Sequence, residues 1–221
     1  MKRVIAVICA AVVLGFGPAI FPEISSSPAV SFVGAANAQQ AEDVDISTVI
    51  EMVQGSEDAP VTVIEYASYT CPHCAAFHAG PYKQLKSDYI DTGKVKLIYR
   101  EVYFDRFGLW ASMIARCAGP DRFFGVTDLM YSGQQTWARA GEPAQIVAEL
   151  RKIGRLAGVS DDQLDVCLQD ASKAQTLVAW YQVNAEADDI TSTPSFVIDG
   201  TKYANMSYED MSARIETALG N

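Results

Sequence analysis

A strand that leads directly into a closely spaced cysteine pair decides the fold, in the stretch Val61-Thr62-Val63-Ile64-Glu65-Tyr66-Ala67-Ser68-Tyr69-Thr70-Cys71-Pro72-His73-Cys74. The β-branched residues at its start predict a buried strand. A helix is predicted to begin around Cys71 and Pro72, because proline is favoured at the first helical position. The two cysteines are therefore expected at the point where a strand ends and a helix begins.

The residues that follow complete a strand-helix-strand unit. One face of the helix is predicted to be apolar, because nonpolar residues recur at every fourth position, at Phe77, Pro81, Leu85 and Tyr89. Pro81 removes a hydrogen bond of the helix and is expected to kink it. A second strand-like run, residues 95–102, predicts a strand parallel to the first.

Helical patterns dominate from about residue 106 to about residue 187. The predicted helices there are 110–117, 122–131, 142–158, a short helix that starts at the capping box of 160–163, and 174–187. Residues 195–198 and 201–203 then predict a hairpin around Asp199-Gly200, and residues 208–219 predict a final helix with Ser207 as its cap. This order indicates an α/β fold, one domain that is interrupted by helices.

The first 38 residues have the features of a secretory signal peptide. Lys2 and Arg3 precede a short apolar run, and the stretch ends in Ala36-Asn37-Ala38, after which cleavage is expected. The alternative is an uncleaved anchor, but glycine and proline break the run before it reaches a membrane-spanning length. Cleavage would leave residues 39–221 as a mature chain in the periplasm. It would also remove Cys9, so that the odd total of five cysteines becomes even.

The composition argues against several classes of function. Of the 221 residues, 49% are hydrophobic and 20% are charged, which is too apolar for a disordered chain. The net charge of −10 argues against binding to nucleic acid or to an anionic membrane surface. These values fit an exported globular domain, which we expect to be a monomer.

The pair Cys71 and Cys74 allows three interpretations. A structural zinc site needs four ligands, usually supplied as two such pairs, and the other cysteines lack that spacing. A purely structural disulfide would gain little, because it closes a very short loop. Redox catalysis fits the position at a helix start. We therefore predict a redox pair, with no metal and no cofactor.

The helix N-terminus favours a thiolate on the first cysteine, because unpaired N–H groups and the helix dipole stabilise negative charge there. Cys71 is predicted to be the exposed nucleophile and Cys74 the buried resolving thiol. His73 could add a positive charge or a hydrogen bond, and Pro72 keeps the two thiols close. A stabilised thiolate favours the reduced form and makes the disulfide oxidising.

Three further features bear on the site. Glu65 is either a charge at a sheet edge or a buried carboxylate that exchanges protons with Cys74. The bond between Thr193 and Pro194 is expected to be trans on the sequence alone, because cis is the rarer form. His78 follows Cys74 by one helical turn and is expected to be solvated.

Cys117 and Cys167 both fall in the helical block. In an oxidising compartment they are the partners left for each other, and a bridge between them would stiffen the block. The alternative, a second redox pair, lacks the close spacing and the position at a helix start. We predict a structural disulfide.

Two segments together resemble the DsbA family, the periplasmic thiol:disulfide oxidoreductases of the thioredoxin superfamily. They are Glu65-Tyr66-Ala67-Ser68-Tyr69-Thr70-Cys71-Pro72-His73-Cys74 and Thr193-Pro194-Ser195-Phe196-Val197-Ile198-Asp199-Gly200. The resemblance covers nearly all of the mature chain. It implies a thioredoxin fold with an inserted helical domain at about 106–187. The second pair, Cys117 and Cys167, resembles the extra bridge of some α-proteobacterial members.

The resemblance also implies an activity and a set of partners. Newly exported proteins with free cysteines would be oxidised through a mixed disulfide on Cys71, and a quinone-linked membrane oxidase of the DsbB type would restore the disulfide. Pro194 matches the family's cis-proline, which with Thr193 would face the cysteines and hold substrate peptide. Glu65 matches the family's buried acid. The sequence departs at Arg100, close to where a lysine often accompanies that acid.

Two other functions compete with the oxidase. One is a thiol reductase or disulfide isomerase that a membrane donor keeps reduced, since threonine before the proline also occurs in those branches. The other is a non-catalytic envelope binding protein that is stapled by disulfides.

Overall fold

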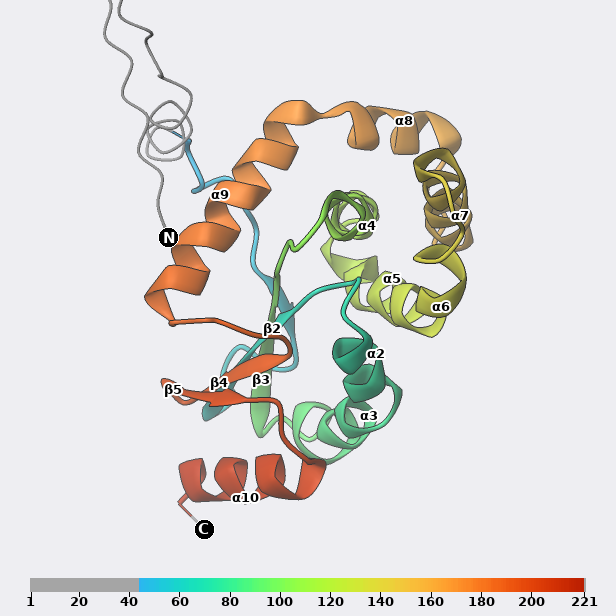
Figure 1. Cartoon of the computed structure of the whole chain (residues 1–221). Coiled ribbons are helices and arrows are strands. Elements are labelled where there is room, and N and C mark those ends of the chain that lie inside the picture. Colours follow the sequence, from blue (N-terminus) through green and yellow to red (C-terminus); the bar gives the residue numbers. More distant parts are fainter. Residues whose placement is uncertain (1–43, 221) are drawn as a thin grey trace, which may run out of the picture.

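The computed structural model describes residues 44–220, which form a central sheet with helices packed around it (Figure 1). The predicted signal peptide and Cys9 lie outside the described residues. The sheet has the strand order β1-β3-β2-β4-β5. Its strands are β1 (Met52–Gln54), β2 (Val61–Ala67), β3 (Val95–Glu101), β4 (Ser195–Ile198) and β5 (Thr201–Ala204).

The sheet confirms the predicted parallel pair and the predicted hairpin, and it joins them through β2 and β4. Strands β2 and β3 run parallel, with Glu65 opposite Tyr99, whereas β4 runs antiparallel to both β2 and β5. The turn between β4 and β5 contains Asp199 and Gly200, both at positive φ, as an Asp-Gly hairpin requires. The three-residue strand β1 was not predicted. It adds to the outer edge of β3 in the antiparallel direction.

The helix after β2 is divided into three pieces. They are α2 (Pro72–Ala79), α3 (Pro81–Leu85) and the π-helical turn η1 (Lys86–Ile90). The chain breaks at Gly80, directly before Pro81, where a kink was predicted. The predicted apolar face is confirmed, because Phe77, Leu85 and Tyr89 are buried.

A run of helices lies between β3 and β4. It consists of α4 (Arg106–Cys117), α5 (Pro120–Ser132), α6 (Gln134–Trp137), α7 (Pro143–Leu156), α8 (Asp161–Gln169) and α9 (Ala171–Ala187). The predicted capping box at Ser160 begins α8. The short α6 was not predicted, and α4 begins four residues earlier than predicted, where the Asp105 carboxylate accepts from two backbone N–H groups. This is a mixed α/β thioredoxin fold with an inserted helical region.

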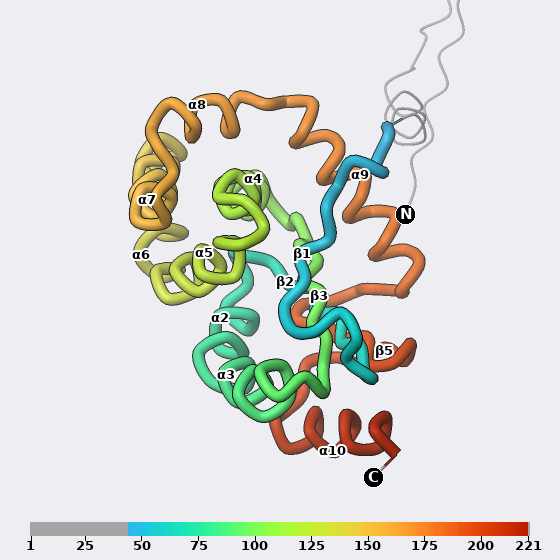
Figure 2. Tube along the Cα trace, turned by 180° about the vertical axis from the view of Figure 1, so that it is seen from behind, coloured from blue at the N-terminus to red at the C-terminus, as the bar shows by residue number. Residues whose placement is uncertain are grey.

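Helix α2 lies where the sheet and the inserted helices meet (Figures 1 and 2). One apolar cluster joins α3, η1 and α10 (Tyr208–Ala218) to the sheet, and Phe77 of α2 belongs to it. The larger cluster fills the helical region, and both Cys71 and Cys74 belong to that one. Figure 2 shows that α9 returns past the N-terminal part of the described chain before it leads into β4. The cysteine pair therefore sits at the junction of two cores.

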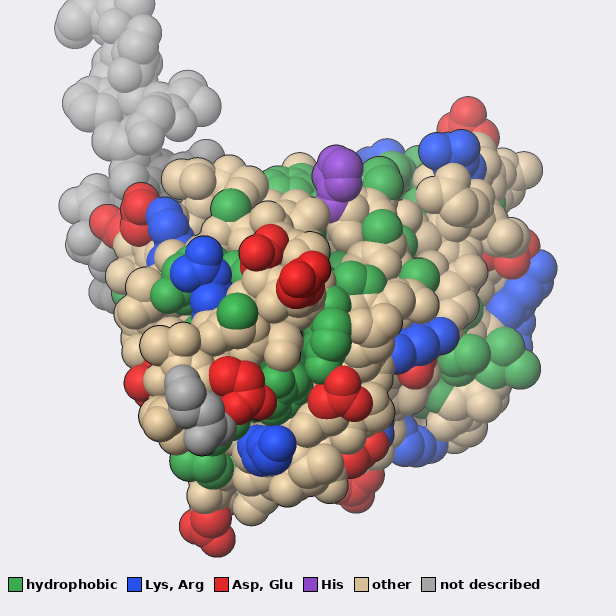
Figure 3. Space-filling view, turned by 90° about the horizontal axis from the view of Figure 1, so that it is seen from below, with side chains coloured by type: hydrophobic (Ala, Val, Ile, Leu, Met, Phe, Trp, Pro, Cys, Tyr) green, Lys and Arg blue, Asp and Glu red, His purple; other side chains and the backbone are tan. Residues whose placement is uncertain are grey.

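The surface carries both signs of charge. In the view from below, acidic and basic side chains are interspersed with apolar ones on the face that contains α10 (Figure 3). Within residues 44–220, no helix combines the length and the apolar character needed to cross a bilayer.

Candidate functional site

The end of β2 and the start of α2 position the cysteine pair. Cys71 is the N-cap residue of α2, and Pro72 occupies the first helical turn as predicted. The backbone N–H of Cys71 donates to the carbonyl of Ser68 at 3.0 Å, which closes the turn between strand and helix. Thr70 Oγ1 donates to Asp105 Oδ2 at 2.8 Å and so ties this turn to the cap of α4.

Gln134 holds the same turn from the inserted region. Its buried Nε2 donates to the carbonyl oxygens of Tyr69 at 2.8 Å and of Cys71 at 2.9 Å. Gln134 was not among the predicted site residues. It lies in the four-residue helix α6, which is too short to show a periodic pattern. A buried glutamine beside two carbonyl groups of a turn can be recognised only once the fold is known.

Cys71 has the properties of an activated nucleophile. A hydrogen bond from Cys74 is the largest influence on its thiolate, and it lowers the pKa of Cys71 from 9.0 to about 5 although partial burial opposes the shift. The Thr193 side chain and the backbone N–H groups of Cys74 and His73 act in the same direction. His73 thus contributes through its backbone, while its side chain is exposed. The Cys71 residue itself is 8% exposed, less than predicted.

The pKa of Cys74 is shifted in the opposite direction to that of Cys71. It is fully buried, and that burial raises its pKa far above the ordinary value; the hydrogen bond to Cys71 and the charges of Cys71 and Glu65 add to the effect. Both cysteines are free thiols in this structure. The pair therefore combines a thiol that ionises readily with one that keeps its proton.

The segment before β4 closes the site on the other side of Cys71. The Cys71 thiol donates to the carbonyl oxygen of Thr193 at 3.4 Å. The bond between Thr193 and Pro194 is cis, contrary to the preference from sequence alone and as the resemblance implies. The Thr193 hydroxyl is buried and has no hydrogen-bond partner within the described residues, so it is available to the Cys71 thiolate.

Glu65 and His78 form a buried pair beneath the cysteines. Glu65 is 0% exposed, which decides between its two interpretations in favour of the buried carboxylate. His78 is 3% exposed, so the expectation of a solvated histidine is wrong. Its Nε2 lies 2.9 Å from Glu65 Oε1, and its ring stacks on Tyr131 with centroids 4.3 Å apart. Cys74 and His78 are four residues apart, so both lie on the same face of α2.

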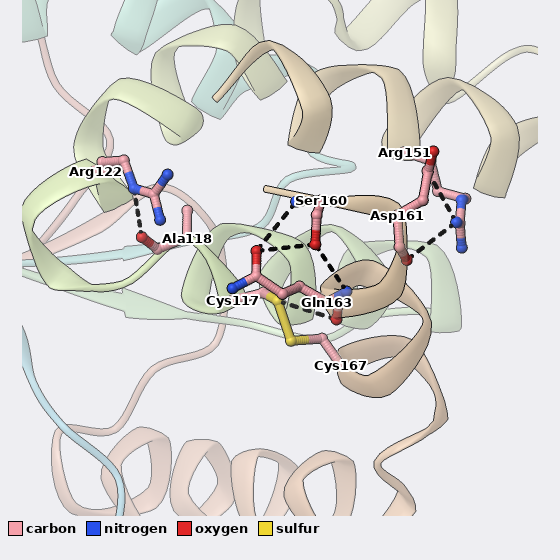
Figure 4. The surroundings of a disulfide bond; sticks show 8 residues. All are labelled: Cys117, Ala118, Arg122, Arg151, Ser160, Asp161, Gln163 and Cys167. Carbon is pink, nitrogen blue, oxygen red and sulfur yellow. Dashed lines mark hydrogen bonds and ion pairs between the residues drawn. A yellow bond between two sulfur atoms is a disulfide. The ribbon is translucent and has the colours of Figure 1, made fainter. Parts of the chain in front are cut away.

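Cys117 and Cys167 are joined by a disulfide across the inserted region (Figure 4). The bridge links the last residue of α4 to α8 over a sequence separation of 50. In Figure 4, Ser160 and Gln163 of the capping box lie beside it, and Arg151 reaches Asp161 at the start of the same helix.

The described residues contain no cluster of three or more histidine, cysteine or carboxylate side chains that could hold a metal ion. Cys71 and Cys74 lie far along the chain from Cys117 and Cys167, which are already bonded to each other. The chemistry that this arrangement can perform is exchange between thiols and disulfides.

Several known proteins are similar to this chain. The thioredoxin family model matches residues 47–217. A Rickettsia bellii protein named "Putative protein-disulfide oxidoreductase" is 34% identical over 76% of this chain and 64% of its own length. "Disulfide bond formation protein D" of Bacillus subtilis is 26% identical, with 76% of each chain covered. The crystal structure of Wolbachia pipientis alpha-DsbA1 superposes with a TM-score of 0.70, at 26% identity, over 77% of this chain and 91% of that one.

The lengths differ among these relatives. The chain spans between 60% and 64% of the Rickettsia proteins it matches. It spans nearly the whole of the Wolbachia structure. The family model, the sheet order and the cysteine pair at a helix start agree. The chain belongs to the thioredoxin family, as a DsbA-like member with a Cys-x-x-Cys pair at Cys71–Cys74 and an additional disulfide between Cys117 and Cys167.

Proposed function

We propose that the protein is an exported protein-disulfide oxidoreductase that donates the Cys71–Cys74 disulfide to newly translocated proteins. The observation that carries the proposal is the opposite behaviour of two neighbouring thiols. The pKa of Cys71 is lowered to about 5, whereas that of Cys74 is raised. Thiol-disulfide exchange requires this combination of an ionised nucleophile and a partner that is released and protonated. The similarity to named disulfide oxidoreductases supports the same activity.

The reaction proceeds through a mixed disulfide. A substrate thiolate attacks Cys71 Sγ of the oxidised pair, and Cys74 leaves as a thiolate that takes up a proton. A second substrate thiolate then attacks the substrate sulfur of the mixed disulfide, and Cys71 leaves as a stable thiolate. The substrate gains a disulfide and the protein keeps two reduced cysteines. Thr193 and Pro194 line the approach to Cys71 and would hold the substrate peptide there.

The compartment and partners follow from this chemistry. A disulfide such as Cys117–Cys167 persists in an oxidising compartment, which fits a protein that is exported to the periplasm by residues 1–38. Substrates would be exported proteins with free cysteines. A DsbB-like, quinone-linked membrane oxidase would restore the Cys71–Cys74 disulfide. The protein would act as a monomer without a cofactor.

The reduction potential of the Cys71–Cys74 couple tests the proposal. The low pKa of Cys71 stabilises the reduced form. When the protein is equilibrated with mixtures of reduced and oxidised glutathione, we therefore expect the pair to be reduced in most of these mixtures. A potential as low as that of a structural disulfide would overturn the oxidase proposal. The Cys74→Ala variant should also trap exported proteins as mixed disulfides on Cys71. A non-catalytic binding protein would trap none and would keep full function after Cys71→Ala.

A further inference from the structure

The Glu65–His78 pair is incompletely satisfied. Glu65 Oε1 and His78 Nε2 lie 2.9 Å apart, but Glu65 Oε2 and His78 Nδ1 have no hydrogen-bond partner within residues 44–220. A buried polar atom without a partner is destabilising, and a buried acid–base pair is a poor source of stability. The pair therefore calls for an explanation other than stability.

Cys74 lies within electrostatic reach of this pair. Cys74 precedes His78 by one helical turn, so the two side chains lie on the same face of α2. Burial has the largest effect on the pKa of Cys74 and on that of Tyr131, whose ring stacks on His78; the Glu65 charge raises both pKa values further, and the Cys74 charge adds to that of Tyr131. Cys74, Glu65 and His78 thus surround one aromatic ring. Glu65 reaches His78 from β2.

A small pocket lies beside the His78 ring. Its volume is about 120 Å³, and His78 lines it together with Ala75, Lys83, Asp128 and Tyr131. A polar cavity of that size can hold several water molecules. The buried imidazole consequently has the carboxylate on one side and a water-accessible pocket beside it.

We propose that His78 is a positioning residue for Glu65 and relays the proton of Cys74 between that carboxylate and the pocket. This inference rests on the proposed function, because it concerns the restoration of the disulfide, in which Cys74 attacks a mixed disulfide between Cys71 and the membrane oxidase. Arg100, close to the place where the family often has a lysine, cannot serve Glu65. It bonds to Glu51 and Asp188, and in the sheet register it lies opposite Tyr66, whereas Tyr99 lies opposite Glu65.

The proton and the electrons balance in this step. The Cys74 thiol gives its proton to Glu65, and the Cys74 thiolate attacks Cys71 Sγ of the mixed disulfide. The sulfur–sulfur bond to the partner breaks, and the partner leaves as a thiolate. The proton passes from Glu65 to His78 Nε2, and His78 releases a proton from Nδ1 to water in the pocket. When the pair oxidises a substrate, Cys74 leaves as a thiolate and the same groups return a proton to it.

Several titratable groups face His78 and belong to any interpretation of pH dependence. They are Glu65 on β2, Cys74 on α2, Tyr82 and Lys83 on α3, Tyr99 on β3, and Asp128 and Tyr131 on α5. Burial raises the pKa of Tyr82, Tyr99 and Tyr131, so these tyrosines stay neutral at ordinary pH. The tyrosines therefore do not contribute to a pH profile near neutrality.

A two-phase reaction separates the relay from nucleophile reactivity. The reduced protein is mixed with an aromatic disulfide whose released thiolate absorbs visible light. Attack by Cys71 releases the first thiolate, and attack by Cys74 on the mixed disulfide releases the second. In His78→Gln we expect the second phase to slow about 100-fold, the lower end of the contribution of a positioned proton acceptor. We expect its rate to rise tenfold per pH unit, because hydroxide then removes the proton. The first phase should change less than twofold.

Tyr82→Phe is the matched control. Its ring also contacts His78, with centroids 4.5 Å apart, and the substitution removes a hydroxyl that bonds to Gln54. It perturbs the same packing without touching the relay, so both phases should be normal. If His78→Gln folds poorly, the paired variant Glu65→Gln/His78→Gln removes the buried charge and should show the same slow second phase.

Chemical rescue distinguishes a proton relay from simple packing. In His78→Ala, added imidazole should restore the second phase, whereas pyrazole, of similar size but hardly basic, should not. Equal rescue by both, or a second phase of normal rate and pH profile in His78→Gln, would overturn the inference. Loss of the first phase in the unmodified protein would instead count against the proposed function, so the two failures are distinct.

Discussion

At the scale of single residues, the hydrogen bond between the two thiols has the largest effect on Cys71. It lowers the pKa of Cys71 more than Thr193 or the backbone N–H groups do. We therefore expect Cys74→Ala to raise the pKa of Cys71 well above 5, because the donor is lost. Cys74→Ser is the matched control, since its hydroxyl can still donate, and it should keep a low value. Ultraviolet titration of the thiolate measures both. Equal values in the two variants would show that the helix N-terminus alone activates Cys71.

The same thiolate makes the stability of the reduced protein depend on pH. The pKa of Cys71 is about 5 in the folded state and 9.0 ordinarily, so the unfolded chain binds one more proton between these values. The free energy of unfolding of the reduced protein should therefore rise from pH 5 to pH 9 and be lost as the pH falls through 5. Above pH 9 the trend should reverse, because the buried Cys74 resists ionisation.

Denaturant unfolding of the oxidised and reduced forms at several pH values checks this expectation. The oxidised form has no Cys71 thiol to titrate, so the difference in unfolding free energy should move in favour of the reduced form as the pH rises. Reduced Cys71→Ser supplies the control and should lack that rise. A difference that stays constant across this range would mean that the Cys71 thiolate is not stabilised by the fold.

The chemistry of the site was predictable from the sequence, but its buried polar partners were less so. Cys71 and Cys74 stand out because their spacing and their place at a helix start have few explanations. The prediction that His78 is solvated was wrong because it took no account of Glu65. A carboxylate within a strand as apolar as that of Glu65 needs a partner, and a histidine four residues after Cys74 lies on the face of α2 turned toward that strand. Gln134 gives no such signal.

At the scale of elements, the packing of α7 against its neighbours depends on one glycine. A Cβ at Gly154 would lie 2.7 Å from Leu164 and 3.2 Å from Ile114, and both of these side chains are fully buried. Overpacking in Gly154→Ala should therefore lower the free energy of unfolding by about 1–3 kcal/mol. The higher helix propensity of alanine offsets part of this loss. Gly125→Ala is the control, because nothing lies within 4 Å of its Cβ position on α5. It should raise stability by about 0.5–1 kcal/mol. Thermal or denaturant unfolding should thus show effects of opposite sign.

The disulfide between Cys117 and Cys167 acts on the same helices. We propose that it is structural, because it joins α4 to α8 across 50 residues and lies away from the reactive pair. Its removal by Cys117→Ala/Cys167→Ala should lower the free energy of unfolding by about 4 kcal/mol, the value that loop entropy gives for a loop of this length. The pKa of Cys71 should stay near 5. A second redox pair would behave differently, with a large loss of exchange activity and little change in unfolding.

The strength of the local signal decided which elements could be predicted. Strands β2 and β3 have seven residues each. The first is rich in β-branched residues and the second alternates between buried and half-buried positions. Ser160 begins α8 with a recognisable capping box. By contrast, β1 has three residues and α6 has four, too few for any period to show. These two short elements exist because the tertiary structure supplies their partners, β3 for one and the turn before Cys71 for the other.

At the scale of the whole molecule, a buried ion pair ties the inserted helices to the sheet. Arg116 of α4 meets Glu101 of β3 with two hydrogen bonds of 2.7 and 2.6 Å, and their side chains are 6% and 1% exposed. Arg116 also donates to the carbonyl oxygen of Ile50, just before β1, and Ser112 donates to the same carboxylate. The ion pair thus connects α4 of the inserted region both to β3 and to the segment before β1.

Breaking this pair should destabilise the molecule more than its hydrogen bonds suggest. Glu101→Gln leaves the Arg116 charge buried without its partner, which should lower the free energy of unfolding by about 3–5 kcal/mol. The exposed pair Lys86–Asp91 is the control, and Asp91→Asn should cost less than about 1 kcal/mol. The double change Glu101→Leu/Arg116→Met should recover much of the loss, because it removes both charges and keeps the volume filled. A double variant no more stable than Glu101→Gln would mean that the pair's geometry, rather than relief from an unpaired charge, holds α4 on the sheet.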